Sequence, residues 1–276
     1  MKKITLGISP CPNDTFIFDA MIHQKIDTKG LEFLVEYHDV EELNMKAFDG
    51  HYDVTKLSYH AFLYLLDHYH LLHSGSALGS GVGPLLVTNS TQKITDWKST
   101  SVAIPGKYTT ANFLLSIAFP EIQNKVVMEF SEIESAVMVG KVDAGLIIHE
   151  GRFTYAQKGL IKVMDMGLFW ERQTSNLIPL GGIASKRTLD KPTSETINQL
   201  IRSSIKYAFK DRESSRDFVK LHAQEMDDTV IDQHIDLYVN KYSLDLGANG
   251  LAAIERMKRE AIQNHLIPNT QKEMFL

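Results

Sequence analysis

The sequence of 276 residues contains a single cysteine, Cys11. One cysteine cannot form a disulfide within the chain, and the paired cysteines of thiolate zinc sites are missing. No histidine, lysine or arginine stands beside Cys11 in the sequence to lower its pKa, so we expect a structural residue and not a nucleophile. The composition therefore gives no reason to expect an oxidising compartment.

An excess of positive charge and long apolar runs are also lacking. Lysine and arginine number 29 against 34 acidic residues, a net charge of −5, which argues against nucleic acid or a membrane surface as a partner. The apolar stretch at residues 4–8 is too short for the h-region of a signal peptide. No later window reaches the roughly 18 apolar residues of a membrane-spanning helix. We therefore expect a cytoplasmic protein.

Hydrophobic residues make up 43% of the chain, enough for ordinary cores in one large or two small domains. Short β-like runs alternate with helical patterns in the first two-thirds of the sequence, which predicts an α/β fold with a mainly parallel sheet. In the first part we expect strands at residues 4–8, 31–37 and 53–57 and helices at residues 15–23, 41–48 and 59–68.

A second α/β series follows a glycine-rich segment, residues 74–84, and ends at another, residues 177–184. Its expected strands are residues 101–104, 126–130 and 144–148, and its expected helices are residues 110–118 and 133–140. Helical patterns alone follow, at residues 194–210, 214–223, 227–240 and 248–264.

We interpret the two glycine-rich segments as crossings between two lobes. The predicted first lobe is discontinuous, residues 1–86 and 184–276, and the second lobe, residues 87–183, is inserted into it. Open α/β sheets bind ligands beyond the carboxyl ends of their strands, so the cleft between the lobes is the expected ligand site.

The first loop that could serve this cleft is Ser9-Pro10-Cys11-Pro12-Asn13-Asp14-Thr15, between a strand and a helix. The prolines stiffen it, and Asn13 or Asp14 can cap the helix. Such a loop can present hydroxyl donors, including that of Ser9, and amide donors to an anion. The alternative is a rigid turn with a cap and no ligand.

Two further loops have the same strand–loop–helix arrangement. Ser58 follows a strand and opens a helix, with the positive charge of Lys56 nearby, so this corner suits a carboxylate; the alternative is a simple cap and a solvated lysine. Thr109 and Thr110 place two hydroxyls at a helix N-terminus after Gly106. The segment does not match the phosphate loop GxxxxGK[ST], so we expect a carboxylate or a small polar group and not a nucleotide.

His149 ends an apolar strand at the edge expected to face the cleft. A histidine there can act as a base near neutral pH, oriented by a carboxylate such as Glu150, although a lone histidine is more often structural. The spacing of His68, His70 and His73 does not put three rings on one face, so we assign no metal.

Several blocks together resemble the 1,4-dihydroxy-6-naphthoate synthase family, lyases of the futalosine pathway of menaquinone biosynthesis. They are Ser9-Pro10-Cys11-Pro12-Asn13-Asp14-Thr15-Phe16, Thr55-Lys56-Leu57-Ser58-Tyr59, Ser74-Gly75, Ala77-Leu78-Gly79, Gly81-Val82-Gly83-Pro84, Gly145-Leu146-Ile147-Ile148-His149-Glu150 and Arg152-Phe153-Thr154-Tyr155. They occur in the family's order and run over nearly the whole chain.

The resemblance implies a two-lobed fold like the type II periplasmic binding proteins, with a catalytic role in the cytoplasm. The family converts cyclic dehypoxanthine futalosine to 1,4-dihydroxy-6-naphthoate and releases dihydroxyacetone. Carried over to this sequence, the proton acceptor falls on His149, and no cofactor is implied. The implied substrate contacts fall on Lys56, Leu57, Ser58, Thr110 and Ala111.

Other interpretations stay open. The same fold serves non-catalytic binding proteins for small carboxylates, disfavoured here because neither a signal peptide nor an N-terminal helix-turn-helix is evident. A transferase or hydrolase acting on another small carboxylate is a third possibility. Glu150 and Arg152 either help to orient His149 or form an ion pair between the lobes. The sequence gives no indication of an oligomeric state. The further residues expected to line the cleft are Ser9, Asn13, Asp14, Thr109, Glu150 and Arg152.

Overall fold

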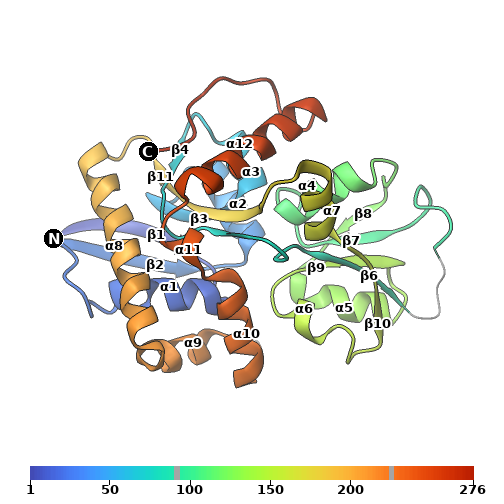
Figure 1. The fold of residues 1–276 in the computed structure, drawn as a ribbon, viewed down its shortest axis with the longest axis horizontal. Helices are drawn as coiled ribbons and strands as arrows, with labels where there is room; N and C mark the ends of the chain where they lie inside the picture. The colour runs from blue at the N-terminus through green and yellow to red at the C-terminus, as the bar shows by residue number, and fades with distance from the viewer. Residues whose placement is uncertain (90–93, 224–226) are drawn as a thin grey trace.

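The chain forms two lobes side by side, each built on its own β-sheet (Figure 1). The structure is a computed structural model that describes residues 1–89, 94–223 and 227–276. Both termini lie on the first lobe, because the chain crosses to the second lobe and returns. The predicted α/β, two-lobed architecture is confirmed.

The first lobe holds a six-stranded sheet with the order β2-β1-β3-β11-β4 and with β5 beside β11. Its strands are β1 (Lys2–Ile8), β2 (Leu31–Tyr37), β3 (Val54–Ser58), β4 (Tyr69–Leu71), β5 (Ala77–Gly79) and β11 (Ile178–Lys186). Its helices are α1 (Pro12–Ile22), α2 (Val40–Phe48), α3 (Tyr59–Tyr64), α8 (Lys191–Lys210), the 3-10 helix η1 (Arg212–Ser215), α9 (Arg216–His222), α10 (Asp228–Tyr238), α11 (Lys241–Leu244) and α12 (Gly247–Gln263).

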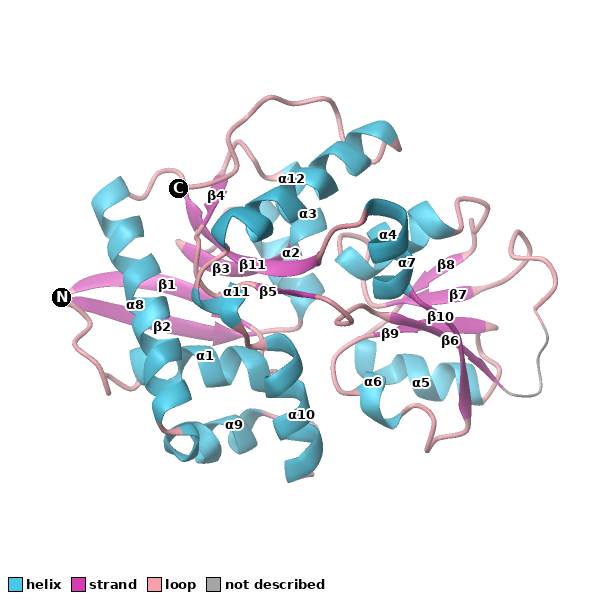
Figure 2. Ribbon diagram, in the orientation of Figure 1, coloured by secondary structure: helices cyan, strands magenta, loops and turns pink. Residues whose placement is uncertain are grey.

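The second lobe holds a five-stranded sheet with the order β10-β6-β9-β7-β8. Helices cover both faces of this sheet, α4 and α7 on one side and α5 and α6 on the other (Figure 2). Its strands are β6 (Leu85–Asn89), β7 (Val102–Ile104), β8 (Lys125–Val127), β9 (Ala144–Ile147) and β10 (Leu160–Asp165). Its helices are α4 (Thr110–Ala118), α5 (Phe130–Met138), α6 (Gly151–Thr154) and α7 (Met166–Thr174).

The two sheets share one plan, which corrects the prediction of mainly parallel sheets. In each, three neighbouring strands are parallel: β2, β1 and β3 in the first lobe, and β8, β7 and β9 in the second. The next strand is antiparallel in both, β11 against β3 and β6 against β9. Because β6 and β11 are the strands that enter each lobe from the other, they run opposite to strands that arrive through a crossover helix.

Parts of the two predicted crossings are regular β-strand, although their glycine content is high. The second glycine-rich segment, interpreted as the return crossing at residues 177–184, is mostly strand β11, which belongs to the first sheet. Residues 85–86 already lie in β6 of the second sheet. Sheet membership therefore changes close to residues 80–84 on the way out and 175–177 on the way back.

Some element boundaries differ from prediction for local reasons. The predicted strand at residues 126–130 ends at Val127, because Phe130 begins α5. The predicted helix at residues 59–68 ends at Tyr64, and Tyr69 starts β4. The strands β4, β5, β6 and β10 and the helices α6, α7 and α11 were not predicted from the sequence. Among the described residues, no helix is both long and apolar enough to cross a membrane.

Candidate functional site

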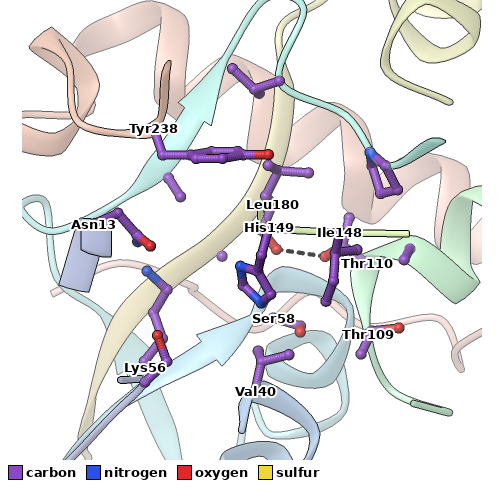
Figure 3. Close-up of a pocket in the computed structure, with 16 residues that line it drawn as sticks. Asn13, Val40, Lys56, Ser58, Thr109, Thr110, Ile148, His149, Leu180 and Tyr238 are labelled. Carbon is purple, nitrogen blue, oxygen red and sulfur yellow. Dashed lines mark hydrogen bonds between the residues drawn. The ribbon is translucent and has the colours of Figure 1, made fainter. Parts of the chain in front are cut away.

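A cavity opens between the lobes and is lined by residues of both (Figure 3). Most of its polar lining comes from the carboxyl end of β3 and from the segments that follow the parallel strands β1, β7 and β9. The carboxyl ends of parallel strands thus meet at one cleft, as the topology of open α/β sheets requires. The lining residues are Ser9, Asn13, Val40, Lys56, Ser58, Ala77, Val82, Pro84, Thr109, Thr110, Ala111, Ile148, His149, Leu180, Gly181 and Tyr238.

Lys56 and Asp14 form a buried ion pair in the wall of this cavity. Lys56 Nζ donates to Asp14 Oδ1 at 2.8 Å, and the two side chains are 7% and 0% exposed. The backbone N–H and the hydroxyl of Ser9 donate to Asp14 Oδ2, and the Asn13 amide donates to Oδ1. Lys56 is therefore not the solvated surface lysine that the alternative interpretation allowed.

Neither Asn13 nor Asp14 caps α1, which corrects one expectation for this loop. The helix begins at Pro12, so Cys11 is the N-cap residue, and its side chain makes no capping hydrogen bond. Asn13 and Asp14 lie inside the first turn, where their side chains organise the wall of the cavity instead. Cys11 is buried, which raises the pKa of its thiol and agrees with a structural role.

Ser58 is held by Asn44 of α2 and does not cap α3. The backbone N–H of Ser58 donates to Asn44 Oδ1 at 3.0 Å, and its Oγ accepts from Asn44 Nδ2 at 3.2 Å. No bond from the Ser58 side chain to the first turn of α3 is formed. The hydroxyl proton of Ser58 is therefore available to a ligand in the cavity, contrary to the interpretation as a simple cap.

The two threonines at the start of α4 use their hydroxyl protons within the protein. Thr109 Oγ1 donates to the Gly106 carbonyl and accepts from the backbone N–H of Asn112, so it caps the helix. Thr110 Oγ1 donates to the Leu180 carbonyl at 2.6 Å, which links α4 to β11 across the cleft (Figure 3). The donors that remain at this end of the helix are the backbone N–H groups of Thr110 and Ala111.

His149 is the second residue after β9 and has a left-handed backbone conformation, with φ at 53°. Its ring lies in the cavity lining near Lys56 and Ser58 (Figure 3). Burial lowers the pKa of His149 to about 4; the Asp14 carboxylate opposes this effect and the Lys56 ammonium adds to it. The ring is therefore neutral at pH 7, the form in which imidazole accepts a proton.

Two rings flank His149. Phe130 lies edge-on, with ring centroids 4.8 Å apart, and the ring of His234 in α10 is nearly parallel to that of His149, at 17° with centroids 6.0 Å apart. His234 is fully buried, and Tyr238, one turn further along α10, lines the cavity. Asn44, His234 and Tyr238 belong to this site although their sequence context did not predict it. The four-residue spacing of His234 and Tyr238 on an otherwise apolar helix face is the feature that could have indicated them.

Several predicted site residues do not line the cavity. Asp14, expected to line the cleft, is fully buried behind Lys56. The Leu57 side chain is fully buried in the core, because alternation along β3 turns Lys56 and Ser58 toward the cleft and Leu57 away. Glu150 Oε1 lies 3.7 Å from Nδ1 of His234. Arg152 pairs with Asp165 at 2.9 Å and donates to the Gly83 carbonyl. The Arg152 ion pair thus lies within the second lobe and not between the lobes.

In the described part of the chain, no group of three or more histidine, cysteine or acidic side chains is arranged to hold a metal ion. Of the histidine-rich tract, His70 lies in β4, buried at the far end of the first sheet from the cavity, and His68 and His73 flank that strand.

Comparison with known proteins places this geometry in context. A family model described as menaquinone biosynthesis matches residues 4–263. A curated protein of Thermus thermophilus, named 1,4-dihydroxy-6-naphthoate synthase, is 41% identical over the full length of both chains. A protein of the same name from Streptomyces coelicolor is 43% identical, covering 96% of this chain and 95% of its own.

Solved structures give the same fold. A crystal structure from Archaeoglobus fulgidus is 35% identical and superposes with a TM-score of 0.90, covering 96% of this chain and 98% of its own. The alkanesulfonate-binding protein of Xanthomonas axonopodis shares only 14% of residues but reaches a TM-score of 0.74, over 98% of this chain and 95% of its own. The two-lobed fold is therefore that of the periplasmic binding proteins.

Proposed function

Because the chain belongs to the menaquinone biosynthesis family, we propose that it is a carbon–carbon lyase of that pathway. The proposed reaction converts cyclic dehypoxanthine futalosine to 1,4-dihydroxy-6-naphthoate and dihydroxyacetone, without a cofactor. The observation that carries the proposal is the neutral ring of His149 in the same cavity as the buried Lys56 ammonium. A base and an anion-binding group thus face one ligand.

The cavity lining divides into groups suited to the two ends of such a substrate. Lys56, the free hydroxyl of Ser58 and the N–H groups of Thr110 and Ala111 favour an anionic or oxygen-rich portion. Apolar side chains cover the remainder and suit an aromatic ring, and the lining is predominantly apolar as in most small-molecule sites. They are Val40, Ala77, Val82, Pro84, Ile148 and Leu180.

In the proposed mechanism, neutral His149 accepts a proton from a hydroxyl or carbon of the sugar-derived portion. The electron pair left behind breaks a carbon–carbon bond of that portion, and the new ring becomes aromatic, which supplies much of the driving force. Negative charge that develops on oxygen is stabilised by Lys56 and by the N–H groups at the start of α4. The imidazolium of His149 then returns its proton to the departing three-carbon fragment or to the product.

Exclusion of water is the further contribution that we assign to the lobes. Thr110 of the second lobe donates to Leu180 of the first, and the Glu41 carboxylate of α2 accepts from the backbone N–H of Tyr108. Contacts of this kind across the cleft support a closed arrangement around the ligand, which strengthens every electrostatic interaction inside. The cytoplasmic location predicted from the sequence belongs to this proposal, and cell fractionation tests it.

The test is to incubate the purified, chelator-treated protein with cyclic dehypoxanthine futalosine and to follow the naphthoate product by absorbance and mass spectrometry. We expect product from the wild type and none above background from His149→Ala, with substrate binding by calorimetry retained in both. Binding without product in the wild type would support the non-catalytic carboxylate-binding protein instead. A requirement for an added cofactor would support a transferase or hydrolase.

A further inference from the structure

His234 is a buried histidine that no step of the proposed mechanism uses. It lies on α10 with 0% of its surface exposed, and its Nε2 is 2.9 Å from Asn13 Oδ1. Its other ring nitrogen, Nδ1, is buried without a hydrogen-bond partner. Buried polar atoms are nearly always paired, so an exception next to a candidate catalytic base calls for an explanation.

A chain of hydrogen bonds fixes which nitrogen of His234 carries the proton. The Asp14 carboxylate accepts from Lys56 and Ser9, and the Asn13 amide nitrogen also donates to it, at 2.8 Å. The Asn13 carbonyl oxygen must then face His234, and it can only accept. The neutral His234 ring is therefore protonated at Nε2, and Nδ1 keeps its lone pair.

The ring of His234 packs beside the ring of His149. The two rings are almost parallel, at 17° with centroids 6.0 Å apart, and the Phe130 ring packs edge-on against His149 at 4.8 Å. Among the described residues, no protein group forms a hydrogen bond to a ring nitrogen of His149. Ring packing therefore holds the base in place here, where many enzymes use a carboxylate.

The charge on His234 affects the basicity of His149, and several ionisable groups face these two rings. Glu150 approaches Nδ1 of His234 at 3.7 Å, Tyr238 packs against its ring, and Asp14 and Lys56 lie on the α1 and β3 side. A protonated His234 would place a second positive charge beside His149 and oppose proton uptake there. Burial lowers the pKa of His234 well below its usual range, and His149 and Lys56 lower it further, so the ring stays neutral.

We propose that His234 is a positioning residue for His149: an uncharged ring, locked as the Nε2–H tautomer through Asn13 and Asp14, that holds the base in orientation without competing for its proton. Nδ1 lacks a hydrogen-bond partner because the contact of Nε2 with Asn13 fixes the tautomer, and no group near Nδ1 does. This inference rests on the proposed function for its kinetic consequences, but its structural consequences do not depend on turnover.

Two variants separate the ring from the hydrogen bond. His234→Gln keeps a donor for Asn13 and removes the ring, and His234→Phe keeps a ring and removes the donor. The matched control is His70→Gln, because His70 is also buried, also has an unpartnered ring nitrogen and lies outside the cavity. Thermal melting of all three shows whether folding is retained.

We expect kcat of His234→Gln to fall by about tenfold or more with KM within about threefold, since a misoriented base affects the chemical step more than binding. His234→Phe should retain a kcat closer to that of the wild type, and His70→Gln should match it. A wild-type kcat in His234→Gln, or an equal fall in both His234 variants, would overturn the proposal.

Nuclear magnetic resonance of histidine-labelled protein supplies the readout that a purely structural role would not give. We expect His234 as the Nε2–H tautomer, without titration between pH 5 and 8, and sharp His149 ring signals that broaden in His234→Gln alone. A protonated or Nδ1–H His234, or unchanged His149 signals in His234→Gln, would refute the role. If the wild type forms no product, the lyase proposal fails, but these spectra still show whether His234 orders the ring of His149.

Discussion

The ammonium of Lys56 and the carboxylate of Asp14 lie 2.8 Å apart in the cavity wall, almost completely excluded from solvent. They act on the pKa of His149 in opposite directions, the carboxylate raising it and the ammonium lowering it. A ligand carboxylate that engages Lys56 would weaken the ammonium's effect and add a negative charge of its own. The basicity of His149 is therefore expected to depend on what occupies the cavity.

Lys56→Met should raise the pKa of His149 above its value of about 4, and Asp14→Asn should lower it further. Histidine-selective resonance titration of the two variants measures both shifts. Lys56→Met should also weaken binding of a naphthoate ligand by more than tenfold, because a charge-assisted contact is lost. Shifts of the same sign in both variants would contradict this account.

The same pair predicts unequal costs in stability. Asp14→Asn leaves the buried ammonium of Lys56 without its counter-charge and should cost about 3–5 kcal/mol in the free energy of unfolding. Lys56→Met should cost less, since Ser9 and Asn13 still donate to Asp14. Urea denaturation of the two variants at pH 7 compares them, and a larger loss in Lys56→Met would reverse the interpretation.

The pH dependence of turnover should report the buried base. Because the pKa of His149 is lowered to about 4, we expect kcat/KM to stay constant from neutral pH down to about pH 5 and to fall only below it. The acid limb of kcat should lie at higher pH than that of kcat/KM, since bound anionic substrate stabilises the imidazolium. Steady-state rates across pH 3.5–8, with stability controls, test this, and an acid limb of kcat/KM near 6.5 would argue against a buried base.

Acid should destabilise the fold through two other histidines. His60 and His70 are 4% and 8% exposed, and burial lowers the pKa of each to about 4. Between that value and the unfolded pKa of about 6.5, the unfolded chain binds more protons, so the free energy of unfolding falls as the pH drops. Each contributes at most about 3 kcal/mol.

Denaturant unfolding at pH 7.5, 5.5 and 4.5 measures this loss. His70→Gln cannot take up the proton and should show a shallower decline than the wild type. Equal slopes in the two proteins would remove His70 from the explanation.

Glu41 should matter for ligand affinity because it connects loops of both lobes. Its carboxylate accepts from the Tyr108 N–H at 3.0 Å and from the Asn44 amide, which in turn holds Ser58. Glu41→Ala should raise KM by about tenfold, because the variant loses a hydrogen bond to a charged group and the free energy of that bond corresponds to about this factor. The neighbouring Glu42→Ala, at an exposed side chain, is the control; the same KM in both variants would exclude the contact between lobes as a determinant of binding.

Prediction from sequence succeeded where local pattern decides structure. Alternating short strands and helices identify the two α/β series, and candidate residues at the carboxyl ends of β1, β3, β7 and β9 lie in the cavity lining. It failed for β11, because the glycines interpreted as a crossing between the lobes instead pack closely against β3: a Cβ on Gly181 would lie 2.8 Å from the Leu57 carbonyl oxygen. It also failed for strand direction, which depends on the lobe from which the chain arrives.

The roles of the polar side chains divide along the same line. The sequence by itself determined which residue types reach the cleft, since strand alternation and the position of a loop after a strand are local properties. The tertiary structure alone decided how each side chain is used. Lys56 forms a buried ion pair with Asp14, and the hydroxyls of Thr109 and Thr110 donate to backbone carbonyls. Asn13 fixes the tautomer of His234. The hydrogen-bond partners of these side chains, and the residues that bury them, are far apart in the chain. These contacts fix the charge of each side chain and the position of its protons.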